Sequence, residues 1–414
     1  MTRRIAAAVA LILGAAGAAA AQAPWGSWGA QAIPSLTQSN VVPGGVALAE
    51  LRVVQPMLMG QGAAFDNHLL GEAMLDGEGW TIPNGELTPG IWGEGFVDRR
   101  HPHTYFHELM LSGIDLLGRR DGSANVSVSA GKGFAPFGSD DPMVRPVLRY
   151  PMNHHYSQIL ERAVAIAAVR TGPVSAEAGL FNGDEPVSPS SWPNMDRFGD
   201  SWSARLRVTP LSPLELEGSY AHVRSPENRE PIGLDQVKWH ASARWERGPA
   251  YALAECARTS EGGGAYVFNS VLVEGTWRGG PHRPYARFEQ TDRPEEERTP
   301  DDPYRLQRPV LDNTLLGVTR WTIVTGGYSF EPPLRARFYV RPLVEASWIR
   351  IRTVGGGVFD PAVWYGRTQG YQLSVGIRLG YGMTMQRMGS YGVAPAMNSM
   401  PGMPGTTGDG APRR

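Results

Sequence analysis

The sequence predicts an all-β protein, a transmembrane antiparallel β-barrel of about 16 strands, with about 14 also compatible with the pattern. Three observations lead to this prediction. Segments of alternating apolar and polar residues recur along the chain, short and long connections alternate between them, and the chain begins with a secretory signal sequence. No later segment has the run of roughly 18 apolar residues that a membrane-spanning helix needs.

The clearest alternation lies in residues 371–381, which begin at Tyr371 and end at Tyr381. Apolar and polar or small side chains alternate without a break, with Leu373, Val375, Ile377 and Leu379 against Gln372, Ser374, Gly376 and Arg378. Successive side chains of a strand point to opposite faces, so one face would meet lipid and the other a watery lumen. The two tyrosines stand where the aromatic girdles of such a barrel are expected.

The same pattern recurs in earlier segments, where charged residues again occupy one face only. It is present in residues 174–180, 202–209, 214–220 and 237–246. An amphipathic strand in a soluble sandwich also alternates, but a soluble core rarely needs so many one-sided strands. The repetition therefore favours a membrane barrel.

The chain divides into four predicted parts. Residues 1–21 have the basic start, apolar run and small-residue cleavage site of a signal peptide, with cleavage expected after Ala21. Residues 22–45 read as a flexible segment, and residues 46–382 as the barrel. Residues 383–414 are rich in Met, Gly and Pro, which is typical of a disordered tail, although thioethers also bind soft metals.

The predicted strands follow one another with turn residues between them. They are residues 47–58, 69–80, 91–97, 104–113, 124–132, 163–170, 174–181, 201–209, 214–223, 236–246, 251–258, 266–277, 284–290, 313–324, 335–350 and 369–381. Residues 210–213 and 247–249 read as tight turns, whereas residues 225–235 and 291–311 are long and charged. Short periplasmic turns and long outer loops are typical of outer-membrane barrels.

Composition excludes several classes of protein. The formal net charge is -1, and the positive charge is almost wholly arginine, because Lys132 and Lys238 are the only lysines. This balance gives no support to nucleic-acid binding. Cys256 is the only cysteine, so the chain forms no intramolecular disulfide.

One region resembles a known family. It contains Gly-Lys-Gly-Phe-Ala-Pro-Phe-Gly at 131–138, Leu-Glu-Arg at 160–162, Arg-Thr-Gly at 170–172, Gly-Leu-Phe-Asn-Gly at 179–183 and Ala-Arg-Leu-Arg at 204–207. This run of landmarks resembles the phosphate-selective porins of the O and P type from about residue 131 to residue 210. The resemblance implies a monomeric or trimeric outer-membrane pore in which a loop folds inward and basic side chains draw anions through.

The resemblance also implies roles for particular residues. The inward loop would be residues 134–158, with Arg145 and Arg149 at the constriction and Asp140, Asp141, His154 and His155 beside them. The lumen would be lined by Lys132, Arg162, Arg205, Arg207, Lys238, Arg244, Arg378, Glu177 and Glu217. Rings of basic side chains favour anions. The alternative for each of these arginines is a cross-strand salt bridge that stiffens the wall.

A histidine cluster at 101–107 is the sharpest local motif. His101, His103 and His107 would share one strand face, and imidazoles at that spacing could hold Zn or Cu. The same face continues into Leu109 and Leu111, which suggests lipid contact. Histidines at a membrane interface explain the motif without a metal, so we predict no metal and no cofactor.

Motifs of common enzymes do not occur in the sequence. It has no Gly-x-Ser-x-Gly elbow, no His-Glu-x-x-His motif and no phosphate-binding loop. The predicted function is passive diffusion of small hydrophilic solutes or anions through an outer-membrane pore. The predicted partners of the barrel are lipid, lipopolysaccharide and, if the pore is a homotrimer, two further copies of the chain. The alternatives are a barrel enzyme that acts on lipid, with Ser112 or Ser157 as nucleophile, and a plugged barrel with a metal-binding or structural role.

Overall fold

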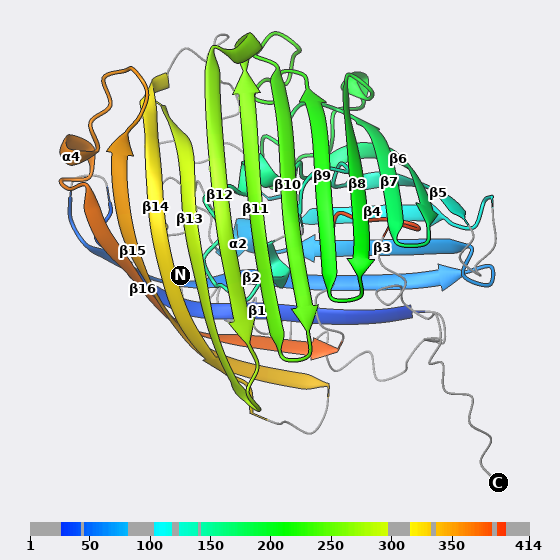
Figure 1. The fold of residues 1–414 in the computed structure, drawn as a ribbon, viewed down its shortest axis with the longest axis horizontal. Helices are drawn as coiled ribbons and strands as arrows, with labels where there is room; N and C mark the ends of the chain where they lie inside the picture. Colours follow the sequence, from blue (N-terminus) through cyan, green and yellow to red (C-terminus); the bar gives the residue numbers. More distant parts are fainter. Residues whose placement is uncertain are drawn as a thin grey trace.

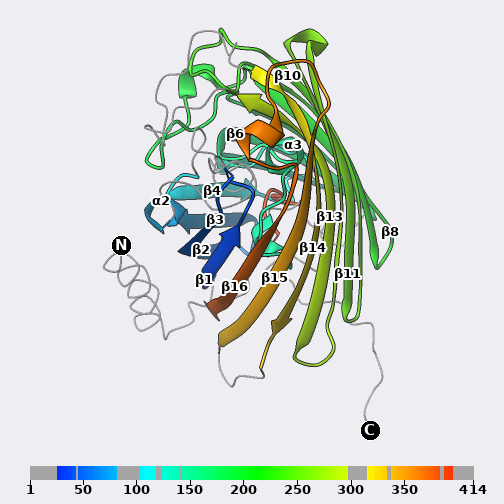
Figure 2. The same ribbon diagram turned by 90° about the vertical axis from the view of Figure 1, so that its left-hand side faces the viewer.

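The computed structural model describes residues 26–42, 45–81, 103–117, 124–139, 142–296, 315–332, 337–382 and 387–394. Within them, 16 strands form one closed antiparallel barrel, as the sequence predicts. Each strand pairs with its neighbours in the chain, and β1 pairs with β16 to close the ring. Figure 1 shows the strands side by side in chain order, and Figure 2 shows β1 lying beside β16.

The strands cover most of the described residues. They are β1 (Gly26–Ser39), β2 (Leu48–Ala64), β3 (Leu69–Asp76), β4 (Phe106–Gly113), β5 (Asn125–Gly133), β6 (Arg162–Thr171), β7 (Val174–Phe181) and β8 (Ser201–Leu211). The second half has β9 (Leu214–Val223), β10 (Gln236–Arg247), β11 (Ala250–Glu261), β12 (Tyr266–Trp277), β13 (His282–Glu296), β14 (Leu315–Phe330), β15 (Phe338–Thr353) and β16 (Gln369–Gly382).

Within the described residues, helices are few and short. They are α2 (Glu78–Thr81), α3 (His154–Ser157) and α4 (Pro361–Trp364), with single 3₁₀ turns at Pro142–Val144, Met195–Arg197 and Gly262–Gly264. In the part of the chain that the structure describes, no helix is long and apolar enough to cross a bilayer.

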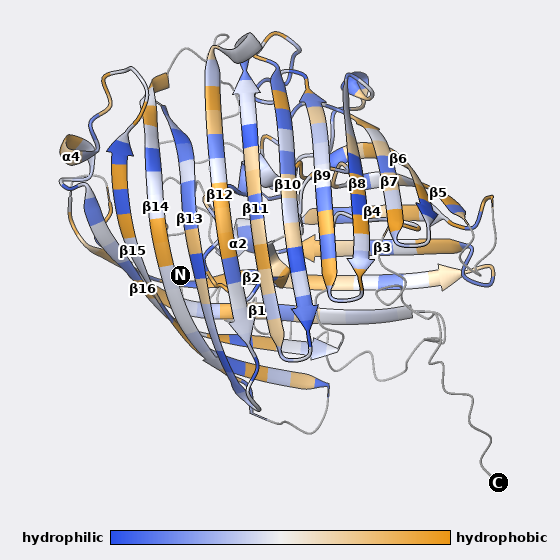
Figure 3. Ribbon diagram, in the orientation of Figure 1, coloured by the Kyte–Doolittle hydropathy of each residue, from blue (hydrophilic) through white to orange (hydrophobic). Residues whose placement is uncertain are grey.

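The outer face of the barrel is apolar and the inner face is polar or charged. On β16, Leu373, Val375 and Ile377 are 45%, 58% and 42% exposed, whereas Gln372, Ser374 and Arg378 are 2%, 3% and 6% exposed. Figure 3 shows the resulting bands of hydrophobic and hydrophilic residues along the strands. The alternation in the sequence therefore divides an exterior face from an interior face, as predicted for 371–381.

Aromatic side chains mark both ends of the apolar band. On the loop side, Tyr371 lies directly opposite Trp348 in the β15–β16 pairing. At the other end, Tyr381 lies opposite Phe338, with ring centroids 5.5 Å apart. This is the arrangement expected where a barrel wall passes through two lipid–water interfaces.

The expectation that residues 22–45 are flexible and that the barrel begins near residue 46 is wrong for residues 26–39. These form β1, which hydrogen-bonds to both β2 and β16. Its sequence hides the strand, because Pro34 removes a backbone donor and a bulge between Gln31 and Ile33 breaks the two-residue period.

The predicted strand at 91–97 lies outside the described residues. In the barrel, β3 pairs directly with β4, from Leu69 opposite Gly113 to Leu75 opposite Phe106. No strand is therefore interposed between them, and β1 supplies the sixteenth strand instead. The two-residue turns β6–β7, β8–β9 and β10–β11 share one rim, while the long connections β5–β6, β7–β8 and β9–β10 share the other.

Candidate functional site

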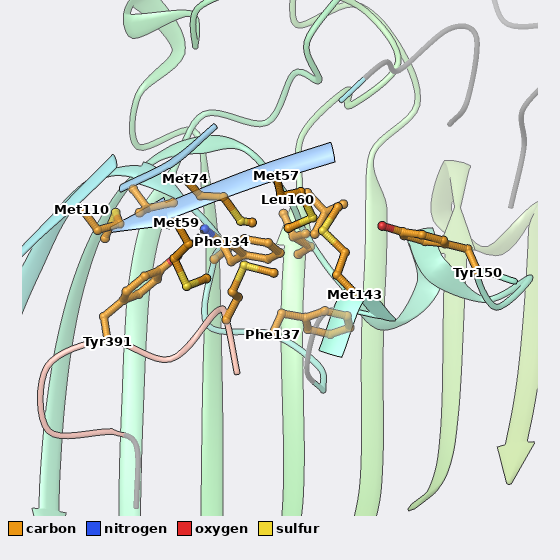
Figure 4. Packing of buried hydrophobic residues seen from close by; sticks show 14 of the residues in the cluster. Met57, Met59, Met74, Met110, Phe134, Phe137, Met143, Tyr150, Leu160 and Tyr391 are labelled. Carbon is orange, nitrogen blue, oxygen red and sulfur yellow. Dashed lines mark hydrogen bonds between the residues drawn. The ribbon is translucent and has the colours of Figure 1, made fainter. Parts of the chain in front are cut away.

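The connection between β5 and β6, residues 134–161, folds into the barrel and is here called the inner loop. Its Phe134 and Phe137 are buried among methionines that point inward from the neighbouring strands β2, β3 and β4, namely Met57, Met59, Met74 and Met110. Figure 4 shows these methionines around Phe134. The inward fold that the sequence predicts for residues 134–158 is therefore stabilised by burial of apolar surface inside the barrel.

The inner loop is also bound to the far wall by charge. The guanidinium of Arg145 donates to both carboxylate oxygens of Glu255 on β11, at 3.2 Å each. Its Nε lies 3.9 Å from the carboxylate of Glu274 on β12. All three side chains are buried, so these are charge-assisted contacts removed from water.

A second set of contacts continues along β13 and β15. Arg149 pairs with Glu289, and the backbone N–H groups of Leu148 and Arg149 donate to Glu345 at 2.8 and 3.3 Å. Arg287 donates to the carbonyl of Arg149 at 2.6 Å. Four wall glutamates thus hold one loop, and the two arginines expected at the constriction point toward carboxylates on the wall.

The paired residues of the lumen wall form cross-strand ion pairs. Arg205 lies opposite Glu177 with contacts of 2.6 and 2.8 Å, and Arg207 lies opposite Glu217 with a contact of 2.8 Å. All four side chains are buried and point inward, as the sequence predicts for the lumen. Their pairing corresponds to the alternative of a stiffened wall, because each positive charge is matched by a negative one.

The other predicted lumen residues also lie on the inner side. Lys132 is 3.7 Å from Glu161, Arg162 donates to Glu185 at 3.0 Å, and Arg244 donates to Glu246 at 2.6 Å. Lys238 donates to Gln236 at 2.9 Å. Arg378 differs from the arginines above, because no carboxylate among the described residues pairs with it, and its Nη1 donates to the carbonyl of Met143 at 3.5 Å.

Residues 387–394, here called the C-terminal segment, enter the lumen from the short-turn rim. The prediction of a disordered tail for residues 383–414 is wrong for this stretch. Tyr391 accepts from the backbone N–H of Phe134 at 2.9 Å and donates to Glu108, and Ser390 accepts from Arg205 and Arg207 at 3.0 Å each. Composition pointed to disorder because the segment cannot form a core alone, whereas the barrel interior supplies one.

The described histidines of the 101–107 motif point inward and do not lie at a membrane interface. His107 is an extra residue in β4, because Met74 of β3 faces Glu108 while Leu75 faces Phe106. This bulge turns His107 into the barrel, although Leu109 and Leu111 on the same nominal face are exposed outside. Because the bulge interrupts the two-residue period, alternation in the sequence could not reveal the inward position of His107. His101 lies outside the described residues.

His107 meets a group of carboxylates and a second imidazole. His103, Asp76 and His107 offer ligand atoms that all lie within 4.8 Å of one another, and all three side chains are buried. The Nδ1 atom of His103 is 3.4 Å from Asp76 Oδ2 and 3.4 Å from Glu78 Oε2. Nitrogen and oxygen donors in this combination could hold a divalent transition metal.

Burial and neighbouring charges shift the pKa of several groups at this place. Burial and the carboxylate of Asp76 raise the pKa of Glu78 to about 7. Burial acts against protonation of His103, but the carboxylates of Asp76 and Glu78 outweigh it and raise the pKa of its imidazole. For Glu161 burial is again opposed, here by His107 and Lys132, which bring its pKa to about 2. Glu161 is therefore an ionised acceptor inside the protein.

The remaining constriction candidates are two histidines of α3 and two aspartates of the inner loop. His154 is buried in α3, with its ring centroid 5.7 Å from that of His103, and His155 is half-buried beside it. Burial, followed by the neighbouring imidazole of His155, lowers the pKa of His154 well below its usual range. Asp140 and Asp141 lie outside the described residues.

Comparison with solved structures returns outer-membrane proteins. The anion-selective porin from Comamonas acidovorans is 12% identical over 86% of this chain and 99% of that chain, with a TM-score of 0.49. OmpF from Salmonella typhi, in complex with daunomycin, is 8% identical over 86% and 97%, with a TM-score of 0.49. OmpT, an outer-membrane protein of Vibrio cholerae, in its trimer form is 10% identical over 86% and 99%, with a TM-score of 0.48.

Comparison by sequence gives no relative. No protein-family model and no curated protein sequence matches the chain. The predicted resemblance to phosphate-selective porins of the O and P type is therefore not confirmed.

Proposed function

We propose that the protein is an outer-membrane channel through which small hydrophilic solutes diffuse passively, with the inner loop setting the width of the passage. The observation that carries this proposal is the inner loop itself, which crosses the inside of a closed 16-strand barrel and is bound to glutamates on the far wall. Export by a cleaved signal peptide, contact with lipopolysaccharide and assembly as a homotrimer belong to the same proposal.

The apolar outer face supports a position in a bilayer, and one substitution tests it. Val375 lies midway between Tyr371 and Tyr381 and is exposed on the outside of β16. We expect Val375→Arg to lower the free energy of unfolding from lipid vesicles by about 2–4 kcal/mol, because an arginine at the bilayer midplane is poorly solvated. Val375→Leu is the matched control, and equal stability of the two variants would contradict lipid contact at this position.

Charge selection in this channel is expected to be weak. Most wall arginines are paired with carboxylates, so little net positive charge faces a passing ion. Arg378 carries the anion preference, because no carboxylate within the described ranges neutralises its charge. In a salt gradient, Arg378→Gln should shift the reversal potential toward cation preference, whereas Arg378→Lys should leave its sign unchanged. An unchanged potential in both variants would remove Arg378 from the selective region.

The proposal is tested by single-channel recording of the refolded full chain in a planar bilayer. Stepwise currents of small amplitude are expected, because the inner loop and the C-terminal segment occupy the inside of the barrel. A barrel that is demonstrably folded but shows no current, with and without the C-terminal segment, would overturn the channel.

A second candidate is a permanently plugged barrel with a structural role. It is favoured by the burial of small inward-facing residues, such as Ser203, Thr259 and Thr325, which a wide water-filled lumen would leave accessible. A lipid-modifying enzyme has less support. The hydroxyl of Ser112 contacts that of Ser129, and the hydroxyl of Ser157 donates to the carbonyl of His154, so neither hydroxyl is held by an imidazole nitrogen.

A further inference from the structure

Three potential metal ligands, with Glu78 beside them, converge on the loop side of the barrel, where β3 ends and β4 begins. Asp76 is the last residue of β3, Glu78 begins α2, His103 precedes β4, and the bulge in β4 carries His107. All four side chains are at least nine-tenths buried. They come from separate backbone elements, so their convergence is a property of the tertiary fold.

Each of these side chains has an atom that the rest of the described chain leaves unsatisfied. Asp76 Oδ2, Glu78 Oε2, both nitrogens of His103 and Nε2 of His107 are buried without a hydrogen-bond partner among the described residues. A buried polar group without a partner is costly, and a carboxylate more so. The clustering of these atoms in one place therefore calls for a ligand.

The other oxygens of the two carboxylates are already engaged. Asp76 Oδ1 accepts from the backbone N–H of Glu78 at 2.8 Å, and Glu78 Oε1 accepts from the backbone N–H of Gln55 at 2.9 Å. These bonds fix the orientation of both carboxylates. Asp76 Oδ2 and Glu78 Oε2 are thereby directed toward His103.

The contact of His107 with Glu161 favours the tautomer that binds a metal. Its Nδ1 is 2.6 Å from Glu161 Oε1, and Glu161 also accepts from the backbone N–H of Thr104 at 3.0 Å and from its hydroxyl at 2.6 Å. A proton on Nδ1 leaves a lone pair on Nε2. A carboxylate that orients a ligating histidine in this way is usual in metal sites.

We propose that Asp76, His103 and His107 form a binding site for one divalent transition-metal ion of the Zn²⁺ type, with Glu78 beside His103 and with Glu161 as the residue that positions His107. The donor set of two imidazoles and one carboxylate suits such ions and is unsuited to Ca²⁺ or Mg²⁺, which prefer oxygen ligands only. Bonds of roughly 2.1 Å in a tetrahedron place neighbouring ligand atoms roughly 3.4 Å apart. His103 Nδ1 lies at that distance from both carboxylates.

Metal binding at this site does not require the protein to conduct solutes. The site would bind the long β3–β4 connection to the end of β3 and, through Glu161, to the end of the inner loop. Its metal would thus hold in place the part of the loop that precedes β6.

The test uses the refolded full chain, freed of metal with a chelator and then given Zn²⁺. We expect one Zn²⁺ per chain by elemental analysis after removal of excess metal. Asp76→Asn and His107→Gln should abolish stoichiometric binding, and Glu161→Gln should lower the affinity about 10- to 100-fold. His240→Gln is the matched control, because His240 is also a buried, inward-facing histidine beside carboxylates. It should bind one Zn²⁺ as the unaltered chain does.

Folding of each variant is checked by heat-modifiable migration of the barrel on gels. If a ligand variant does not fold, Co²⁺ bound to the unaltered chain decides the matter, because a tetrahedral nitrogen and oxygen site gives strong visible absorption. A folded unaltered chain that keeps no stoichiometric Zn²⁺ and gives no such Co²⁺ spectrum would overturn the proposal. So would folded Asp76→Asn and His107→Gln variants that each still bind one Zn²⁺ with unchanged affinity.

Discussion

Replacement of Glu255 with alanine is expected to free the inner loop from the far wall and to increase the single-channel conductance several-fold. The carboxylate of Glu255 accepts two bonds from Arg145, one from Ser139 at 2.5 Å and one from Asn153 at 2.9 Å. Its removal takes the nearer carboxylate away from the buried Arg145, which keeps a contact of 3.9 Å with Glu274 and a hydrogen bond of 2.7 Å to Ser139 Oγ. Removing one partner of a buried pair typically costs about 3–5 kcal/mol, so the loop should leave the lumen.

The matched control is Glu246→Ala on the same side of the barrel. Glu246 pairs with Arg244 at 2.6 Å but is exposed, so its loss should change the free energy of unfolding by at most about 1 kcal/mol. Both variants are compared by denaturant unfolding in lipid vesicles and by single-channel recording. Equal conductance in the two variants would show that the Glu255 contacts do not hold the loop in the passage.

Removal of the C-terminal segment is also expected to increase the single-channel conductance. A chain that ends at Gly382 loses the contacts of Tyr391 with Phe134 and of Ser390 with Arg205 and Arg207. It also exposes the methionine-lined surface that Tyr391 covers in the apolar cluster. We expect the conductance to rise several-fold, because the segment occupies the lumen between the inner loop and the short-turn rim.

A chain that ends at Ala394 is the appropriate control, since it keeps the whole C-terminal segment. Its conductance should equal that of the full chain. Tyr391→Phe removes only the hydroxyl and should give an intermediate conductance, with closures that are shorter or less complete. If both truncated chains conduct like the full one, the segment does not obstruct the passage.

The strands that alternate strictly were predictable, and the reason is local. β7, β9 and β12 have the bounds that the alternation predicts, because each side chain position is decided by a two-residue period and each strand ends at turn residues. The inward position of residues 134–161 was also predictable, but only from a resemblance. The sequence did not identify the glutamates that bind that loop as its partners, since they lie on four distant strands.

Two elements were missed for a different reason. β1 is a strand because β2 and β16 lie on either side of it and closure of the ring requires it, although its own sequence contains Pro34 and a bulge. The C-terminal segment is ordered because a lumen of complementary charge surrounds it. In both cases the stabilising partners are remote in the chain, so no local pattern records them.

By itself, the sequence determined the all-β class and the division into an apolar exterior and a polar interior, whereas the loop within the barrel was indicated by a resemblance. Only the tertiary structure decided that Arg145 and Arg149 face carboxylates, that His107 points inward and that residues 387–394 fill part of the lumen. The physical reason is that the two-residue period determines which face of a strand a side chain occupies. Bulges, long-range ion pairs and the closure of the ring determine which groups come into contact there.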